Sequence, residues 1–216
     1  MNALKQAVAT AAINYIDDNT IIGVGHGSTV NYFIEALSSI KNRIDACVAS
    51  SKATEQLLRK HGIPVVSLNV AAEVALYIDG ADEVNARCEM IKGGGGALTG
   101  EKIVATVAKK FICIVDESKI VRRLGSFPVA VEVLPMARSF VAREIVKLGG
   151  SPEYREGFVT DSGNIILDVY NLDIQVPIKL EEEISIIPGV IENGIFARRT
   201  ADKVLVARDG GLDVLN

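Results

Sequence analysis

The strongest constraint on the fold is the way the hydrophobic period changes along the chain. Short apolar runs at residues 20–24, 45–49 and 74–78 are separated by stretches in which apolar side chains recur at helical spacing. Strands that alternate with helices in this way are typical of βαβ units, whose parallel strands form a sheet covered by helices. The first part of the chain is therefore predicted to be an α/β domain with a Rossmann-like parallel sheet. The predicted strands are 20–24, 45–49, 65–68, 74–78 and 111–115, and the predicted helices are the segment up to residue 18, 31–37, 51–60 and 99–110.

A different pattern begins after residue 126, where longer strands have polar alternation. The predicted order is strand 129–134, helix 137–148, strands 151–156 and 164–171, helix 178–187 and strand 190–196. This βαββαβ order is that of a ferredoxin-like unit. A last apolar strand at 203–207 is predicted to return to the first sheet. We therefore expect a smaller ferredoxin-like α+β domain, residues 126–198, inserted into a Rossmann-like catalytic domain formed by residues 1–125 and 199–216.

The composition excludes several classes of protein. The 216 residues are 49% hydrophobic, which is enough for a sizeable core and too apolar for a disordered chain. A net charge of −4 argues against nucleic acid as a partner, because phosphate backbones require a basic face. The three cysteines are far apart and are expected to be reduced thiols of a cytoplasmic protein. The first residues resemble an amphipathic helix rather than a signal peptide, and no apolar run approaches the ~18 residues of a membrane span.

Four segments follow predicted strands, at the sheet edge where ligands of open α/β folds bind. The first is GVGHGST at residues 23–29, which has neither the dinucleotide spacing G-x-G-x-x-G nor the lysine of a P-loop. Its backbone N–H groups and the following helix start could bind an anion. It could equally be a tight turn in which Ser28 or Thr29 caps the helix. The segment alone leaves both interpretations open.

The second segment is the acidic turn DGADE at residues 79–83. Three acids so close together repel one another unless a cation, a metal ion or substrate hydroxyls interact with them. An EF-hand is excluded by the position of the glycine and by Ala81 and Glu83. A Mg²⁺ site made by Asp79 and Asp82 and a merely solvated turn remain as alternatives, although no other acidic cluster supports the metal.

The third segment, KGGGGALTGE at residues 92–101, contains four consecutive glycines between Lys92 and Glu101. Ordering such a run is entropically costly, and close approach of the backbone to a ligand would explain it. Taken individually, Lys92 could be a surface lysine and Glu101 an acid that complements a helix dipole. The fourth segment, DESK at residues 116–119, is an ordinary charged turn in which Lys119 is of interest only for its place after a strand.

Together these segments indicate proton transfer on a small phosphorylated molecule. A glutamate can take a proton from carbon, and an ammonium group with neighbouring donors can stabilise the enediolate that results. Binding of a phosphate would hold the substrate away from the reacting carbons. His26 and His61 are too far apart in the sequence for a metal site or a Ser-His-Asp triad.

The motifs also resemble a known family, the A-type ribose-5-phosphate isomerases. The matching segments are GVGHGSTV, YIDGADEVN, KGGGGALTGEKIVA, IVDESK and ENGIFA, in that order and over essentially the whole chain. The resemblance implies isomerisation of D-ribose 5-phosphate and D-ribulose 5-phosphate through an enediolate, in the non-oxidative branch of the pentose phosphate pathway. It also implies that the enzyme needs no cofactor or metal and is a homodimer, in some members a tetramer.

By the same resemblance, Glu101 carries the proton between C2 and C1, and Asp79, Asp82 and Lys92 contact the sugar hydroxyls and carbonyl oxygen. The other implied substrate-binding residues are Lys5, His26, Gly27, Ser28, Thr29, Gly80, Ala81, Gly93, Gly94, Gly95 and Lys119. The chain departs from the family at His26, where a small hydroxyl residue is usual. Two alternatives to the isomerase are a catalytically silent sugar-phosphate sensor, which should lack the base or the lysine, and a CoA transferase, which would form an acyl-glutamate.

Overall fold

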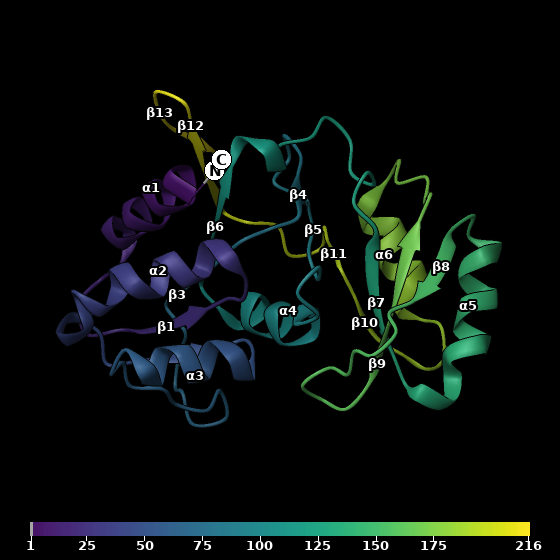
Figure 1. Ribbon diagram of the computed structural model, residues 1–216, viewed down its shortest axis with the longest axis horizontal. Helices are drawn as coiled ribbons and strands as arrows, with labels where there is room; N and C mark the ends of the chain where they lie inside the picture. Colours follow the sequence, from purple (N-terminus) through teal and green to yellow (C-terminus); the bar gives the residue numbers. More distant parts are fainter. Residues whose placement is uncertain (1) are drawn as a thin grey trace. The chain divides into compact units, whose positions relative to one another are not determined.

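The computed structural model describes residues 2–216, which form two compact units (Figure 1). Within these residues, the first unit comprises residues 2–81, Gly100–Lys119 and Ala201–Asn216, and the second comprises Asp82–Thr99 and Ile120–Thr200. A six-stranded sheet in the first unit and a four-stranded antiparallel sheet in the second confirm the predicted combination of a parallel-sheet domain with a smaller α+β domain. None of the helices within residues 2–216 is long and apolar enough to cross a membrane.

The sheet of the first unit has the strand order β13-β12-β6-β3-β1-β2, and only β13 runs antiparallel to its neighbour. Its strands are β1 (Ile21–Val24), β2 (Ala46–Ala49), β3 (Leu76–Asp79), β6 (Lys110–Asp116), β12 (Lys203–Arg208) and β13 (Gly211–Leu215). Its helices are α1 (Asn2–Ala12), α2 (Ser28–Ser38), α3 (Lys52–Lys60) and α4 (Leu98–Val107, from Gly100 onward in this unit), with short 3₁₀ turns η1 (Ile13–Tyr15), η2 (Lys41–Arg43) and η3 (Glu117–Lys119).

The two faces of this sheet are covered by different helices. Ile22, Val24 and Ile78 point toward one face, where they pack in the core with apolar residues of α1, α2 and α3. Gly23 and Tyr77 alternate with them and therefore point to the other face, toward Val104 of α4. Figure 1 shows α1 and α2 next to each other.

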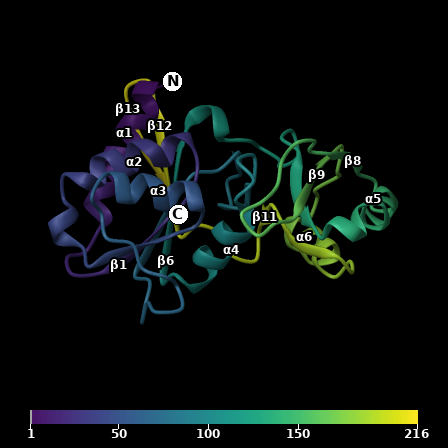
Figure 2. The ribbon, with the colours of Figure 1, turned by 60° about the horizontal axis from the view of Figure 1, so that its bottom comes forward.

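The second unit contains the predicted ferredoxin-like order. Its four-stranded sheet, β10-β7-β9-β8, is antiparallel throughout, and the alternate residues of β7 and β9 form a core with α5 and α6. Figure 2 shows both helices on the same side of this sheet. The elements are β7 (Val129–Val133), η4 (Pro135–Ala137), α5 (Arg138–Lys147), β8 (Ser151–Tyr154), β9 (Ile165–Tyr170), α6 (Pro177–Ser185) and β10 (Val190–Asn193).

A small third sheet was not predicted from the sequence. It consists of β4 (Glu83–Val84), β5 (Met90–Ile91) and β11 (Ile195–Phe196), in the order β11-β5-β4. The strand predicted at 190–196 is broken at Gly194, whose N–H bonds to Ala130 and whose carbonyl oxygen accepts from the N–H of Lys92. At this glycine the chain passes from β10 of the four-stranded sheet to β11 of the three-stranded sheet. A Cβ here would lie 2.2 Å from the Lys92 carbonyl oxygen, so this position requires a residue without a side chain.

The unit boundaries differ from the predicted domain boundaries because of this third sheet. Residues 82–99, expected in the larger domain, belong to the second unit because β4 pairs with β5 and β5 pairs with β11. The segment predicted as a strand at 65–68 forms only a single bridge between Val65 and Cys47. All three cysteines are buried thiols, and burial raises the pKa of Cys47 to about 12.

Candidate active site

The turn between β1 and α2 holds several predicted binding residues of the first unit. Helix α2 begins at Ser28, after Gly27, and the N–H groups of its first turn have no intrahelical acceptors. The Lys5 Nζ donates to the Ser28 Oγ at 2.9 Å, which places an ammonium group at the same helix start. This arrangement of N–H groups, hydroxyl and ammonium is suited to a phosphate.

Asp79 ends strand β3 and is completely buried, with 0% exposure. Its Oδ1 accepts from the backbone N–H of His26 at 3.0 Å and from that of Gly80 at 2.7 Å. Its Oδ2 accepts from the hydroxyl of Tyr77. The solvated-turn interpretation does not apply to Asp79, because a buried carboxylate needs such donors to compensate for lost water.

The β1–α2 turn is held close to Asp79 by its backbone. The N–H of Gly25 donates to the Ile78 carbonyl oxygen at 2.8 Å, and its carbonyl oxygen accepts from Thr54 Oγ1 at 2.6 Å. A Cβ at Gly25 would lie 1.9 Å from Asp79 Oδ1, so only glycine fits there. Gly25 is thus explained by contact with a carboxylate, whereas Gly23 lies against the side chains of Val104 and Tyr77.

Glu101 lies in the first turn of α4 and is 4% exposed. A glutamate that only complemented the helix dipole could remain in water, whereas burial of a carboxylate is costly. Its charge acts on the buried phenol of Tyr77, as does the charge of Asp79. Within the first unit, the structure therefore brings two predicted acids to one buried tyrosine.

Sequence reasoning missed Tyr77, although a signal for it was present. Residues two apart on a strand share a face, so Tyr77 and Asp79 of β3 had to point the same way. Burial, followed by the charges of Asp79 and Glu101, raises the pKa of Tyr77 well above its usual value. The phenol is therefore a neutral hydrogen-bond donor at physiological pH.

The second unit carries Asp82, Lys92 and the glycine run. Lys92 is 2% exposed and follows β5, with its Nζ 5.5 Å from the ring centroid of Phe196. It is therefore not the surface lysine considered as an alternative. Asp82 is half-buried, and its Oδ2 accepts from the N–H of Gly94 at 2.9 Å. The structure thus brings one of the predicted acids into direct contact with the glycine loop.

Arg155, which the sequence did not single out, holds the other side of this loop. Its Nε and Nη2 bond to the two oxygens of Asp168 at 2.8 and 2.5 Å, and its Nη1 donates to the carbonyl oxygens of Gly93 and Gly94 at 3.3 Å. No local pattern could have revealed it, because its partners are 13 and about 60 residues away.

We expect Arg155→Met to lower the free energy of unfolding by roughly 3 kcal/mol, because it leaves Asp168 largely buried without its cation. Urea unfolding measures this change. The matched control is Arg59→Met, which removes the exposed pair with Glu55 and should cost less than about 1 kcal/mol. Equal losses in the two variants would contradict the structural role given to Arg155.

The remaining predicted residues have less distinctive surroundings. Lys119 ends η3 and is half-buried, and Gly80 and Ala81 are half-buried between the two aspartates. Gly94 and Gly95 are exposed, whereas Gly93 is buried. Within residues 2–216, no group of three or more His, Cys, Asp and Glu side chains could hold a metal ion.

The His26 side chain is not the part of that residue which contacts Asp79. The contact comes from its backbone N–H, while Nδ1 of the ring lies 2.9 Å from Ser51 Oγ. We expect His26→Thr to keep turnover within about 5-fold of the wild type, since losing one neutral hydrogen bond corresponds to about 1 kcal/mol. Steady-state kinetics check this, and a variant without turnover would show that the imidazole itself is needed.

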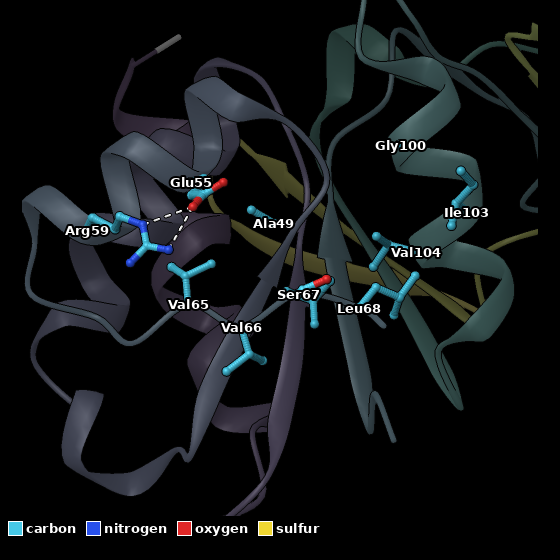
Figure 3. A pocket seen from close by; sticks show the side chains of 11 residues that line it. Ala49, Glu55, Arg59, Val65, Val66, Ser67, Leu68, Gly100, Ile103 and Val104 are labelled. Carbon is cyan, nitrogen blue, oxygen red and sulfur yellow. Dashed lines mark hydrogen bonds and ion pairs between the residues drawn. The ribbon is translucent and has the colours of Figure 1, made fainter. Parts of the chain in front are cut away.

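A separate hollow of about 390 Å³ in the first unit contains none of the predicted site residues (Figure 3). It lies among α3, residues 65–68 and α4, and its lining is mainly aliphatic apart from the Glu55–Arg59 ion pair. One of its lining residues, Gly100, is adjacent in sequence to the candidate residue Glu101.

Comparison with known proteins decides the family. The model of the family "Ribose 5-phosphate isomerase A (phosphoriboisomerase A)" matches residues 46–211. The chain belongs to the ribose 5-phosphate isomerase A family. A ribose-5-phosphate isomerase A of Legionella pneumophila (strain Corby) is 68% identical over 215 residues, which cover 100% of both chains.

Solved structures of family members support the same assignment. A ribose 5-phosphate isomerase A from Neisseria gonorrhoeae has a TM-score of 0.97 and 50% identity, covering 99% of this chain and 96% of that one. A D-ribose-5-phosphate isomerase in complex with phospho-erythronic acid has a TM-score of 0.95 and 38% identity, covering 99% and 98%. The family assignment favours the isomerase over the CoA transferase alternative.

Proposed function

We propose that this member of the isomerase A family interconverts D-ribose 5-phosphate and D-ribulose 5-phosphate, as an aldose–ketose isomerase of the non-oxidative pentose phosphate pathway. The observation that carries the proposal is the buried Glu101 at the start of α4, in a chain whose full length matches enzymes of that name. A sensor that lacked catalysis would not require a buried carboxylate at this position.

Glu101 is proposed as the base. Its carboxylate removes the proton from C2 of the open-chain aldose, and the electrons of that C–H bond form the C1–C2 double bond of an enediolate. Negative charge then develops on O1. Transfer of a proton from O2 to O1 and return of the first proton from Glu101 to C1 give the ketose, with no net change in atoms or charge.

Lys92, Asp79 and Asp82 are proposed to bind the oxygens of the sugar. The Lys92 ammonium stabilises the oxygen on which charge develops, and one such donor is typically worth ~3–4 kcal/mol in the transition state. Asp79 and Asp82 accept hydrogen bonds from sugar hydroxyls and assist ring opening. Both carboxylates are already held by backbone N–H groups, so they need little rearrangement when substrate binds.

The phosphate is proposed to bind at the start of α2. N–H groups of the first helical turn, which have no intrahelical acceptors, the Ser28 hydroxyl and the Lys5 ammonium all offer hydrogen-bond donors to a dianion. The complex of a family member with phospho-erythronic acid, a phosphorylated hydroxy acid, supports a substrate that carries a phosphate and a further anionic oxygen. His26, Gly27, Thr29, Gly80, Ala81, the residues Gly93–Gly95 and Lys119 are proposed to complete the pocket.

The direct test is conversion of ribose 5-phosphate to ribulose 5-phosphate by the purified protein with EDTA present throughout. We expect full turnover, since the proposed mechanism uses only side chains and no cofactor. Activity that EDTA abolishes and Mg²⁺ restores would contradict this mechanism and favour the metal site at Asp79 and Asp82. Binding of the sugar phosphate without turnover would instead favour the sensor.

The resemblance also leads us to propose a homodimer in the cytoplasm, with no nucleic acid or membrane partner. The mild negative charge and the buried thiols support this setting.

A further inference from the structure

One buried hydroxyl remains unused in this mechanism. Tyr77 is the largest of the side chains that are completely buried, and its ring packs against Phe111 with 5.0 Å between centroids. A phenylalanine would supply the same apolar contact without a polar atom. A buried hydroxyl lowers stability unless it is hydrogen-bonded, so its partner is the feature to explain.

The partner is Asp79. A phenol has a single proton, and the Tyr77 hydroxyl donates it to Oδ2, while Oδ1 accepts the N–H groups of His26 and Gly80. Donors at both oxygens fix the plane of the carboxylate. The two backbone donors meet only Oδ1, so of these three hydrogen bonds the tyrosine alone holds Oδ2.

The surroundings of Tyr77 also favour the protonated phenol. Burial and the charges of Asp79 and Glu101 raise the pKa of Tyr77 well above 10. At physiological pH the Tyr77 hydroxyl is therefore a hydrogen-bond donor to Asp79.

We propose that Tyr77 is a positioning residue for the isomerisation, whose hydroxyl holds the Asp79 carboxylate in the orientation in which it acts on the substrate. This inference rests on the function proposed above. A positioning role matters most in the transition state, where a misdirected carboxylate lowers kcat, while ground-state binding continues through the phosphate and the other hydroxyls.

The test is Tyr77→Phe, which removes one oxygen and adds no atom. We expect kcat to fall at least 10-fold and KM for ribose 5-phosphate to change less than 3-fold. The matched control is Tyr32→Phe, which removes a hydroxyl from the partly buried side chain of another core residue of the same unit and should leave kcat within 2-fold. Circular dichroism at the assay temperature establishes the folded fraction, so that kcat refers to folded molecules.

Three results would overturn the inference. The first is a kcat of Tyr77→Phe within 2-fold of wild type, and the second is an equal loss of kcat in Tyr77→Phe and Tyr32→Phe. The third is a lower urea midpoint of Tyr77→Phe with unchanged kcat per folded molecule, which would assign the hydroxyl to stability alone. An inactive wild type would instead overturn the proposed function, and the inference with it. The two failures are thus distinguishable.

Discussion

Glu101→Gln is expected to lose at least ~100-fold in kcat, with KM for ribose 5-phosphate little changed. The amide has almost the same shape as the carboxylate but cannot accept a proton, and positioned general bases typically contribute about 10²–10⁴-fold. Because Glu101 is buried in the first turn of α4, the substitution keeps the side chain in place. Initial rates of ribulose 5-phosphate formation, with EDTA present, measure the effect.

Glu35→Gln is the matched control for this experiment. Glu35 lies on α2 in the same unit and is exposed, so its replacement removes the same charge without touching the proposed chemistry. We expect the control to keep wild-type kcat. If the Glu101→Gln variant kept full activity, Glu101 would not be the base, and its role would be only to complement the dipole at the start of α4.

The second large effect is expected from Gly25→Ala, a change of one methyl group. The new Cβ would lie 1.9 Å from Asp79 Oδ1, and both backbone polar groups of Gly25 are hydrogen-bonded, so the turn cannot easily move aside. The Asp79 side chain must therefore leave its donors. We expect kcat/KM to fall at least ~100-fold, which is about 2.7 kcal/mol of transition-state stabilisation.

Gly211→Ala tests whether this loss comes from the site. Gly211 belongs to β13 of the same unit and has no atoms within 4 Å of the position of a Cβ. We expect wild-type kinetics for this variant. If the kcat/KM of Gly25→Ala also stayed within 3-fold of wild type, the observed position of the Asp79 carboxylate would not be required for catalysis.

The sequence was sufficient to predict the order of the elements and the main candidates for chemistry, because both depend on local pattern. The strands of the parallel sheet are short apolar runs, and the helices between them have clear amphipathic spacing. The acidic turn and the glycine run stood out because residues of those types are costly in ordinary structure. The structure adds the burial of Asp79, Lys92 and Glu101, whereas their roles remain predictions.

What could not be predicted depends on contacts between distant segments. The strands β4 and β5 are only two residues long, and neither the pairing of β4 with β5 nor that of β5 with β11 has a periodic signal. Arg155 reaches Gly93 from another part of the chain. The carboxylate of Glu83, the third acid of the turn at residues 79–83, accepts hydrogen bonds from the N–H groups of Gly125 and Phe127 and so is a structural acceptor.

The position of β12 in its sheet has a consequence for the newly made protein. This strand pairs with β6 on one side and β13 on the other, and both β12 and β13 are translated after the whole second unit. Until they emerge from the ribosome, β6, whose central residues 111–115 are apolar, presents an edge with unpaired N–H and C=O groups, which can pair with other chains. Completion of the first unit therefore waits until the whole second unit has been synthesised, and chains stalled before residue 203 should be the species most in need of chaperones.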